Sequence, residues 1–249
     1  MFKKPQTELA HSTISKGTSI VSANSVFKTY RSGDLTVPAL KGIDLEILSG
    51  EFVAIVGPSG NGKSTLLNCL SGIDTIDSGQ VKIAGQDIFK LRDSKRTTQR
   101  ASMMGFVFQS FNLIPVFSAV ENVEMPLLAA GIKPKVARQQ SLQSLERVGL
   151  NNRGAHRPSQ LSGGEQQRVA IARALVAQPA IIWADEPTGN LDSTTAENIV
   201  ELLKEVNSNG QTVVVVTHDR SIANDSPRLI EVRDGLIHSD TNITEKVSS

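Results

Sequence analysis

The hydrophobic positions of this chain fall into two alternating patterns, and their order predicts the fold. Short apolar runs at 52–56, 180–184 and 212–217 have the length and content of strands that are buried on both faces. Apolar residues at helical spacing lie between and beside these runs, and they predict helices over 163–177 and 194–207. Helices that alternate with strands in this way are typical of a parallel sheet, so the pattern predicts an α/β core.

A strand-rich segment precedes this core. Residues 22–28 and 40–48 alternate between apolar and polar positions, and a turn signal at Gly33-Asp34 separates them. We expect these residues to form a β-rich region ahead of the apolar run at 52–56. The expected boundaries are a tail of 1–20, a folded domain of 21–238 and a second tail of 239–249.

Residues 90–160 interrupt the alternation of strands and helices. They begin with basic and polar residues and continue with several aromatic residues. An amphipathic helix then starts near Pro134 and ends at Gly149, as the apolar spacing and these two boundary residues indicate. We expect this part to form a helical subdomain that is inserted into the α/β core.

Composition narrows the classes of function. The 249 residues contain 26 Lys and Arg against 25 Asp and Glu, and this balance gives no support to a nucleic-acid partner. The single cysteine, Cys69, excludes an internal disulfide and fits a reducing compartment. The longest apolar runs fall far short of the roughly 20 residues of a membrane helix, so we expect that the chain does not span a membrane by itself.

A glycine-rich motif follows the first buried run. It reads Gly57-Pro58-Ser59-Gly60-Asn61-Gly62-Lys63-Ser64, after a predicted strand and before a predicted helix. Glycines let main-chain N–H groups wrap phosphate oxygens, and the helix N-terminus adds a favourable dipole. We expect Lys63 to reach the β- and γ-phosphates of a nucleotide and the Ser64 hydroxyl to bind Mg²⁺.

Two carboxylates end the strand at 181–184. Asp185 is expected to support the Mg²⁺ ion, and Glu186 to position and activate the attacking water. Because neighbouring strand residues point to opposite sides, the two carboxylates need not serve one ion. An ordinary solvated pair is the alternative, and the phosphate-binding motif upstream favours the catalytic interpretation.

Two more polar residues follow strand-like runs. His218 comes after 213–217 and is placed either to contact a γ-phosphate at the edge of the sheet or to be structural. Gln109 ends the run 106–108, and its amide either binds Mg²⁺ or water or has no such role. The residues alone leave these alternatives open.

The run Leu161–Arg168 contains a second anion-ready helix start. Ser162 can cap the helix, and Glu165 would complete a capping box. Two glycines, Gly163 and Gly164, are costly there, at about 1 kcal/mol each against alanine where they are helical. Small residues at a helix N-terminus suit an anion that comes very close. A simple helix cap is the alternative.

In order along the chain, these motifs resemble those of ABC-type ATPase domains, over about residues 22–237. The matching motifs are Walker A at 57–64, the Q-loop at Gln109, the signature at Leu161–Gln167, Walker B at Ile181–Glu186, the D-loop at Asn190–Asp192 and the H-loop at His218. The resemblance implies a P-loop NTPase core with an antiparallel β subdomain and an inserted α-helical subdomain. It also implies ATP and Mg²⁺ as ligands.

The resemblance implies roles for individual residues. Tyr30, with Phe27 as the other nearby aromatic, would stack on adenine. Ser162 and the amides of Gly163 and Gly164 would contact the γ-phosphate held by a second copy of the chain. Residues 57–65, which include Thr65, would bind the phosphates. The implied catalytic residues are Glu186, His218, Gln109 and Lys63, and the implied metal ligands are Ser64, Gln109 and Asp185.

Several segments are similar to the lipoprotein-releasing (LolD) and macrolide-export (MacB) branch of the family. They are Phe111–Pro115, Glu121–Leu127, His156–Leu161 and Asp185–Asp192, and Asn61 departs from the serine that is common there. The resemblance implies an ATP-hydrolysing subunit at the cytoplasmic face of the cell (inner) membrane. It would power a separate transmembrane permease with a large extracytoplasmic domain, together with a possible periplasmic or membrane-fusion adaptor.

FtsE and BceA subunits are similar as well, so mechanical signalling across the membrane or peptide resistance is the alternative to export or lipoprotein extraction. The helical subdomain, together with the segment 109–117, is expected to form a docking groove for a cytoplasmic helix of the membrane partner. Phe111 and Phe117 suit either that apolar groove or a plain core position.

Overall fold

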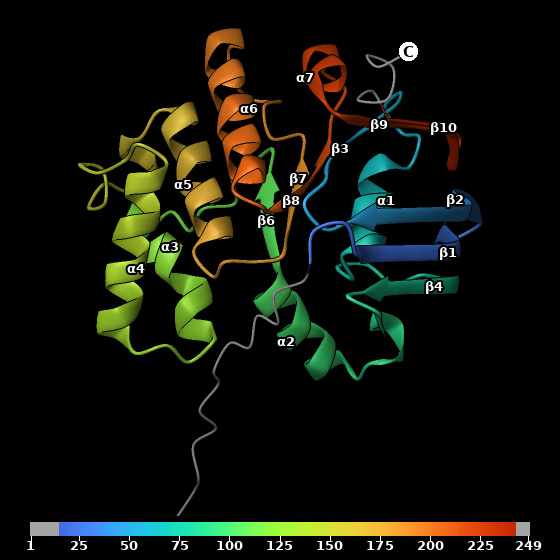
Figure 1. The fold of residues 1–249 in the computed structure, drawn as a ribbon, viewed down its shortest axis with the longest axis horizontal. Helices are drawn as coiled ribbons and strands as arrows, with labels where there is room; N and C mark the ends of the chain where they lie inside the picture. Colours follow the sequence, from blue (N-terminus) through green and yellow to red (C-terminus); the bar gives the residue numbers. More distant parts are fainter. Residues whose placement is uncertain (1–14, 243–249) are drawn as a thin grey trace, which may run out of the picture.

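The parallel sheet expected from the sequence forms the centre of the molecule (Figure 1). The computed structural model describes residues 15–242, apart from the side chains of 220, 221 and 224. Six strands lie in the order β10-β9-β3-β8-β7-β6, and β9, β3, β8, β7 and β6 are parallel. Their bounds are β3 Phe52–Val56, β6 Met104–Phe108, β7 Ile181–Asp185, β8 Thr212–Val216, β9 Arg228–Arg233 and β10 Leu236–Asn242.

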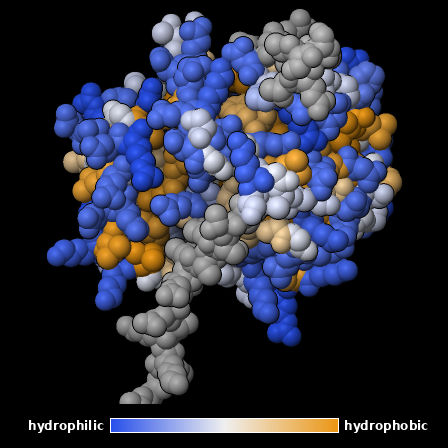
Figure 2. Space-filling view, in the orientation of Figure 1, coloured by the Kyte–Doolittle hydropathy of each residue, from blue (hydrophilic) through white to orange (hydrophobic). Residues whose placement is uncertain are grey.

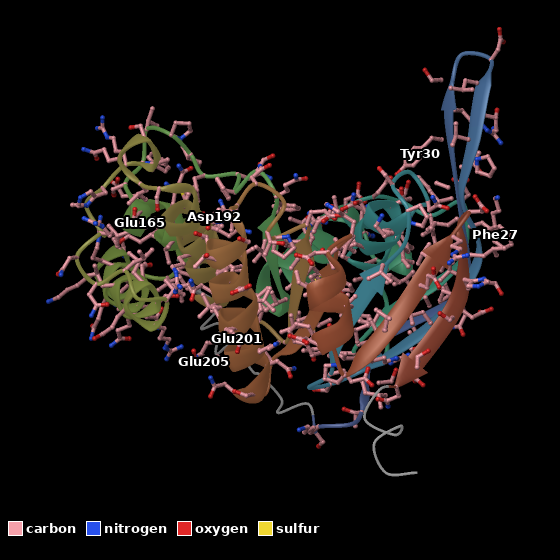
Figure 3. The ribbon with its side chains drawn as sticks, turned by 90° about the horizontal axis from the view of Figure 1, so that it is seen from above. Phe27, Tyr30, Glu165, Asp192, Glu201 and Glu205 are labelled. Carbon is pink, nitrogen blue, oxygen red and sulfur yellow. The ribbon has the colours of Figure 1, made fainter. Side chains whose placement is uncertain are left out.

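A second sheet is antiparallel, as the family resemblance implies. Four strands lie in the order β2-β1-β4-β5, with bounds β1 Ser19–Ser32, β2 Leu35–Leu48, β4 Ser78–Ile83 and β5 Gln86–Asp87. The long strands β1 and β2 form a hairpin whose turn contains Gly33 at φ +57°. Seen from above, this hairpin projects beyond the body of the molecule (Figure 3).

The six-stranded sheet separates the core into two parts, because neighbouring strand residues point to opposite faces. One face packs against α1 (Lys63–Leu70) and the antiparallel sheet, and Trp183 of β7 is fully buried there. The other face packs against α5 (Gly163–Leu175) and α6 (Ser193–Ser208). The helix that follows the phosphate-binding motif and the helix that follows the signature therefore lie on opposite faces.

The helical part of the chain is smaller than the sequence suggested. Within the expected subdomain of 90–160, β6 pairs with β7 and so belongs to the central sheet. The residues around β6 form α2 (Asp93–Met103), α3 (Ala119–Ala129) and α4 (Pro134–Arg147). Short helical turns lie at Ile88–Lys90 and Pro158–Gln160, and α7 spans Arg220–Asp225.

The ordered ends also differ from the expected boundaries. β1 begins at Ser19, and Ile20 is buried, so this strand starts inside the expected tail of 1–20. β10 continues to Asn242, past residue 239, because it pairs with β9 up to that residue. The rest of the two expected tails, 1–14 and 243–249, lies outside the described residues. Among the described helices, none is long and apolar enough to cross a membrane.

Candidate functional site

The glycine-rich motif forms a loop between β3 and α1 whose backbone only glycine accommodates easily. A Cβ at Gly57 would lie 2.0 Å from the carbonyl oxygen of Val232, and Gly62 has φ +95°. Lys63 begins α1, and its Nζ donates to the carbonyl oxygen of Pro58 at 2.9 Å. The ammonium group thus curls back over the loop, where a bound phosphate would take the place of that carbonyl as its partner.

Asn61, which departs from the serine common in the family, fastens this loop to the β9–β10 turn. Its Oδ1 accepts from the main-chain N–H of Asp234 at 2.7 Å, and its carbonyl oxygen accepts from the N–H of Gly235 at 3.3 Å. Its Nδ2 donates to the carbonyl oxygen of Ser59 at 3.2 Å. The asparagine amide makes its two side-chain contacts through separate atoms, with the oxygen accepting and the nitrogen donating, and the contact with Gly235 is made by the main chain.

Ser64 and Asp185 meet at the start of α1. The Ser64 hydroxyl donates to Asp185 Oδ1 at 2.9 Å, so a hydroxyl and a carboxylate oxygen converge on one point. Magnesium prefers oxygen ligands and retains waters and phosphate oxygens, so this pair fits the ion. Burial raises the pKa of Asp185, the Ser64 bond opposes that change, and the charge of Glu186 raises the pKa further.

Glu186 has a left-handed backbone, with φ +48°. A non-glycine residue in this region is strained, at a cost of order 1–3 kcal/mol, and it persists where its surroundings hold it. The main-chain N–H of Glu186 donates to the carbonyl oxygen of Val216 at 2.8 Å, and Glu186 Oε2 lies 2.9 Å from His218 Nδ1. The twist thus turns the carboxylate toward the end of β8, where His218 holds it.

Lys63, Ser64, Glu186 and His218 line one pocket of about 680 Å³, and Asp185 borders it through its hydrogen bond with Ser64. Its lining residues are Tyr30, Val37, Pro38, Ala39, Lys41, Ser59–Thr65, Gln109, Glu186, His218, Asp234 and Gly235. Tyr30 and Val37 are cross-strand partners on β1 and β2, and both are partly exposed. The phosphate-binding loop and the catalytic candidates thus share one pocket with an aromatic ring.

The structure separates the two aromatic candidates for stacking. Tyr30 lines the pocket, whereas Phe27 packs its ring where a Cβ of Gly42 would stand, 2.9 Å away. The two side chains leave β1 on different sides, with Tyr30 toward α1 (Figure 3). Tyr30 is therefore the aromatic residue available to a nucleotide in this pocket.

Gln109 lies at the edge of the pocket and is held by a reciprocal pair of hydrogen bonds. Its Nε2 donates to Asn190 Oδ1 at 3.2 Å, and Asn190 Nδ2 donates to the carbonyl oxygen of Gln109 at 3.0 Å. On the far side of the same segment, Arg173 of α5 donates to the carbonyl oxygens of Phe111 and Asn112. The segment after β6 thus links the pocket to the signature helix.

The helix start at Ser162 is the capping box expected from the sequence. The N–H of Glu165 donates to Ser162 Oγ at 3.3 Å, and the N–H of Ser162 donates to Glu165 Oε2 at 2.9 Å. The two glycines differ in their surroundings. A Cβ at Gly164 would lie 2.5 Å from Thr195 Cγ2, whereas a Cβ at Gly163 would meet only an ordinary contact, 3.4 Å from Leu191 Cδ2.

Packing therefore requires glycine at 164 but not at 163. The lining of the nucleotide-sized pocket, drawn from the described part of the chain, includes none of Leu161–Arg168. Since α5 and α1 cover opposite faces of the sheet, the signature does not meet the phosphate-binding loop of its own chain.

Comparison with known proteins decides the family. Residues 40–189 match the ABC transporter family. The chain belongs to the ABC transporter family. It is an ATPase of the cassette type, and the antiparallel sheet and helical subdomain are those of an ABC cassette. The dimeric cassette MJ0796 in a post-hydrolysis state bound to ADP and Pi has a TM-score of 0.83 at 46% identity, over 90% of this chain and 98% of that one.

Two kinds of curated relative stand out. The lipoprotein-releasing system ATP-binding protein LolD of Xanthomonas axonopodis pv. citri is 48% identical over 90% of this chain and 92% of its own length. The macrolide export ATP-binding/permease protein MacB of Brucella melitensis biotype 1 is 49% identical over 90% of this chain. The cassette spans only 35% of the length of that MacB protein. These relatives place the cassette in the LolD and MacB branch.

The structure brings most of the expected residues of the cassette together. The phosphate-binding loop, Asp185, Glu186, Gln109 and His218 line or border one pocket, and Tyr30 joins them. Ser162, Gly163 and Gly164 lie apart from it, as the resemblance implied. The sequence did not predict the contact of Asn190 with Gln109. Asn190 was identified only as part of the D-loop motif, and that motif does not indicate which residue its side chain contacts.

Proposed function

We propose that the chain is the ATP-hydrolysing subunit of a transporter of the MacB/LolD type, and that it drives a separate transmembrane permease through ATP-driven pairing of two cassettes. The observation that carries this proposal is the separation of the two anion-binding elements. One chain carries its candidate phosphate-binding pocket at the carboxyl ends of the parallel strands, next to α1. The signature helix α5 lies on the opposite face of the sheet from α1, and packing within the chain does not require glycine at its residue 163. Two copies arranged head to tail would complete both sites.

Within each pocket, the residues of the chain have separate tasks. Main-chain N–H groups of the loop and Lys63 bind the phosphates, and Ser64 with Asp185 would hold Mg²⁺, which neutralises charge on the phosphates when bound. Glu186 accepts the proton of the attacking water and orients that water toward the γ-phosphate. His218 holds the Glu186 carboxylate in place through the 2.9 Å contact.

Gln109 connects this chemistry to the rest of the cassette. Its amide now pairs with Asn190, so it reaches a metal ion or water in the pocket by exchanging that partner. Arg173 of the signature helix donates hydrogen bonds to the same segment, so a shift of Gln109 would change the position of α5. This contact supports a link between nucleotide binding and the orientation of the helical subdomain.

Pairing of two cassettes gives a switch of sufficient size. Moving an equilibrium between open and closed forms from 1:99 to 99:1 takes about 5.5 kcal/mol of differential binding, of which each of two shared ATP molecules would supply half. Ser162 and the amides of Gly163 and Gly164 would bind the γ-phosphate held by the second copy. Hydrolysis and release of phosphate then remove the contact that holds the closed form.

The surface near the helical subdomain supports docking of a membrane partner. Figure 2 shows apolar side chains gathered over α3 and α4. The exposed apolar side chains from the loop after Gln109 to the end of α3 are Ile114, Val116, Met125 and Leu128. Phe111 and Phe117, the two aromatic candidates for the groove, are half-buried.

The relatives indicate the kind of partner that this surface would receive. The chain matches 92% of the length of a LolD protein but only 35% of the length of a MacB protein, whose name includes a permease. We therefore assign it a permease with a large extracytoplasmic domain, at the cytoplasmic face of the inner membrane, with a periplasmic or membrane-fusion adaptor as a further component. The proposal includes no nucleic-acid partner, because a net charge of +1 does not provide the excess of basic residues that phosphate backbones attract.

The role of Glu186 predicts a specific result for Glu186→Gln. The variant loses the group that accepts the proton from water, so ATP turnover falls by at least about a hundredfold while ATP binding is kept. The ATP-bound dimer then accumulates, and analytical ultracentrifugation with Mg-ATP shows a dimer where the wild type is largely monomeric. Normal turnover in this variant would refute the role of Glu186.

Gly163→Ala separates the two explanations of the signature glycine. Because a methyl group fits at Gly163 and alanine favours helix, the variant melts at or above the wild-type temperature. If the amides at the signature bind the partner's γ-phosphate, the added methyl group crowds the close approach of that phosphate. We then expect ATPase activity to fall about tenfold or more, equivalent to about 1.4 kcal/mol, while ATP binding to the monomer is unchanged. If Gly163 is only part of a helix cap, activity stays at the wild-type level.

Co-isolation from detergent-solubilised membranes tests the transporter assignment. The tagged wild-type chain is expected to recover a membrane protein with a large extracytoplasmic domain, and Val116→Asp to lose it while keeping ATPase activity. Leu35→Asp is the control, because Leu35 is similarly exposed (64% against 69%) but lies on the distant β1–β2 hairpin. Recovery of the wild type with no membrane protein would contradict the proposal.

A further inference from the structure

Tyr30, the aromatic side chain that lines the pocket, forms a cluster with two side chains that the catalytic scheme does not use, Lys28 and Asp74. Lys28 and Tyr30 lie on β1, and Asp74 lies on the connection between α1 and β4. The Tyr30 hydroxyl donates to Asp74 Oδ2 at 2.7 Å, and Lys28 Nζ donates to Asp74 Oδ1 at 2.9 Å. One carboxylate thus binds the phenol with one oxygen and a lysine with the other.

The carboxylate is charged and well partnered. Burial alone would raise the pKa of Asp74, but the hydrogen bonds from Lys28, from Tyr30 and from the N–H of Thr75 lower it overall. Lys28 is 7% exposed, and its Nζ also lies 5.1 Å from the centre of the Tyr30 ring. A hydrogen bond to a charged acceptor is about twice as strong as a neutral one, so the phenol is held firmly.

Asp74 is fixed to the helix that carries the phosphate-binding lysine. Its main-chain N–H donates to the carbonyl oxygen of Asn68 in α1, the helix that begins at Lys63. The bond from Tyr30 to Asp74 therefore joins the aromatic wall of the pocket to the same rigid element that holds the phosphates. The distance between the ring and the phosphate-binding loop is set through α1.

Such a tie is needed because Tyr30 stands on a projecting hairpin. The residues around the turn between β1 and β2, 31–38, are all exposed, and this end of the hairpin extends away from the body (Figure 3). Tyr30 itself is 42% exposed. A ring that is ordered before binding loses less conformational entropy when a base stacks on it.

We propose that Asp74, supported by Lys28, is a positioning residue that presets the Tyr30 ring for stacking on the nucleobase, so that it governs the base-dependent part of nucleotide affinity. This inference rests on the proposed assignment of the pocket to ATP. It adds the residues that determine how much the nucleobase contributes to the affinity for ATP. Lys28 lies against the ring, and the remaining exposed ring surface, beside its cross-strand neighbour Val37, is left for the base.

The test compares ATP with inorganic tripolyphosphate, which has the phosphates but no base, by isothermal titration calorimetry at fixed Mg²⁺. Base–aromatic stacking is worth about 1–3 kcal/mol, so we expect wild type to bind ATP at least about fivefold more tightly than tripolyphosphate. Asp74→Ala and Tyr30→Phe are each expected to weaken ATP binding about three- to tenfold and to leave tripolyphosphate binding within about twofold.

A double-mutant cycle identifies the path of the effect. If Asp74 acts through the Tyr30 hydroxyl, Asp74→Ala produces no further loss of ATP affinity in the Tyr30→Phe background. Asp74→Asn, which keeps an acceptor for the hydroxyl, restores most of the affinity. Asp77→Ala is the matched control, because Asp77 Oδ2 accepts from the N–H of Thr29 at 2.7 Å and thus ties the same strand without touching the ring.

Each outcome decides the proposal. Equal losses for ATP and tripolyphosphate, additive effects in the cycle, or the same selective loss in Asp77→Ala would show a general effect on the hairpin and overturn it. If Asp74→Ala fails to fold, Tyr30→Phe carries the test alone, since it leaves the Lys28–Asp74 pair intact; unchanged ATP affinity in that variant overturns the proposal. A wild type that binds neither ligand would instead contradict the assignment of the pocket to ATP.

Discussion

The register of the central parallel strands is the constraint on which the site depends. Phe108, Asp185, Val216 and Ile55 form one row across β6, β7, β8 and β3. Because these strands are parallel and in register, the residues that follow them emerge at a single edge. Gln109, Glu186, His218 and the phosphate-binding loop, which are far apart in sequence, are brought together by that row alone.

The same sheet also keeps two elements apart. Its two faces carry separate cores, with α1 in one and α5 in the other, so the signature is turned away from the phosphates that its own chain binds. In the proposed mechanism a second copy of the chain therefore has to supply the signature that contacts each ATP. At Gly164, Thr195 leaves no room for a methyl group, so packing explains the glycine. At Gly163 there is room, so packing does not explain why that residue is glycine.

Local pattern was enough to predict the buried strands, a glycine-rich loop between β3 and α1, and the capping box of Ser162. In each of these the signal lies within a short window, such as the apolar run 52–56 followed by glycines. Helix boundaries were also close, since α5 ends at Leu175 against an expected 177. The single cysteine, Cys69, is buried, and burial raises its pKa to about 12.

Features that depend on distant partners could not be predicted in this way. The place of β6 within the central sheet follows from its pairing with β7, more than seventy residues later in the chain, and so the helical subdomain was drawn too large. The left-handed backbone of Glu186 accompanies a hydrogen bond from its N–H to the carbonyl oxygen of Val216 on the neighbouring strand. The roles of Asn61 and Asp74 likewise appear only once their hydrogen-bond partners are known.

The central claim is that each ATP is shared by the phosphate-binding loop of one copy and the signature of the other. Mixing two inactive variants tests it most directly. Lys63→Ala removes a phosphate ligand, and Ser162→Arg blocks the signature, so neither variant hydrolyses ATP alone. In a mixed pair arranged head to tail, both lesions fall in one site and the other site is intact. The account predicts that ATPase activity reappears on mixing; a mixture that stays as inactive as its components would contradict it.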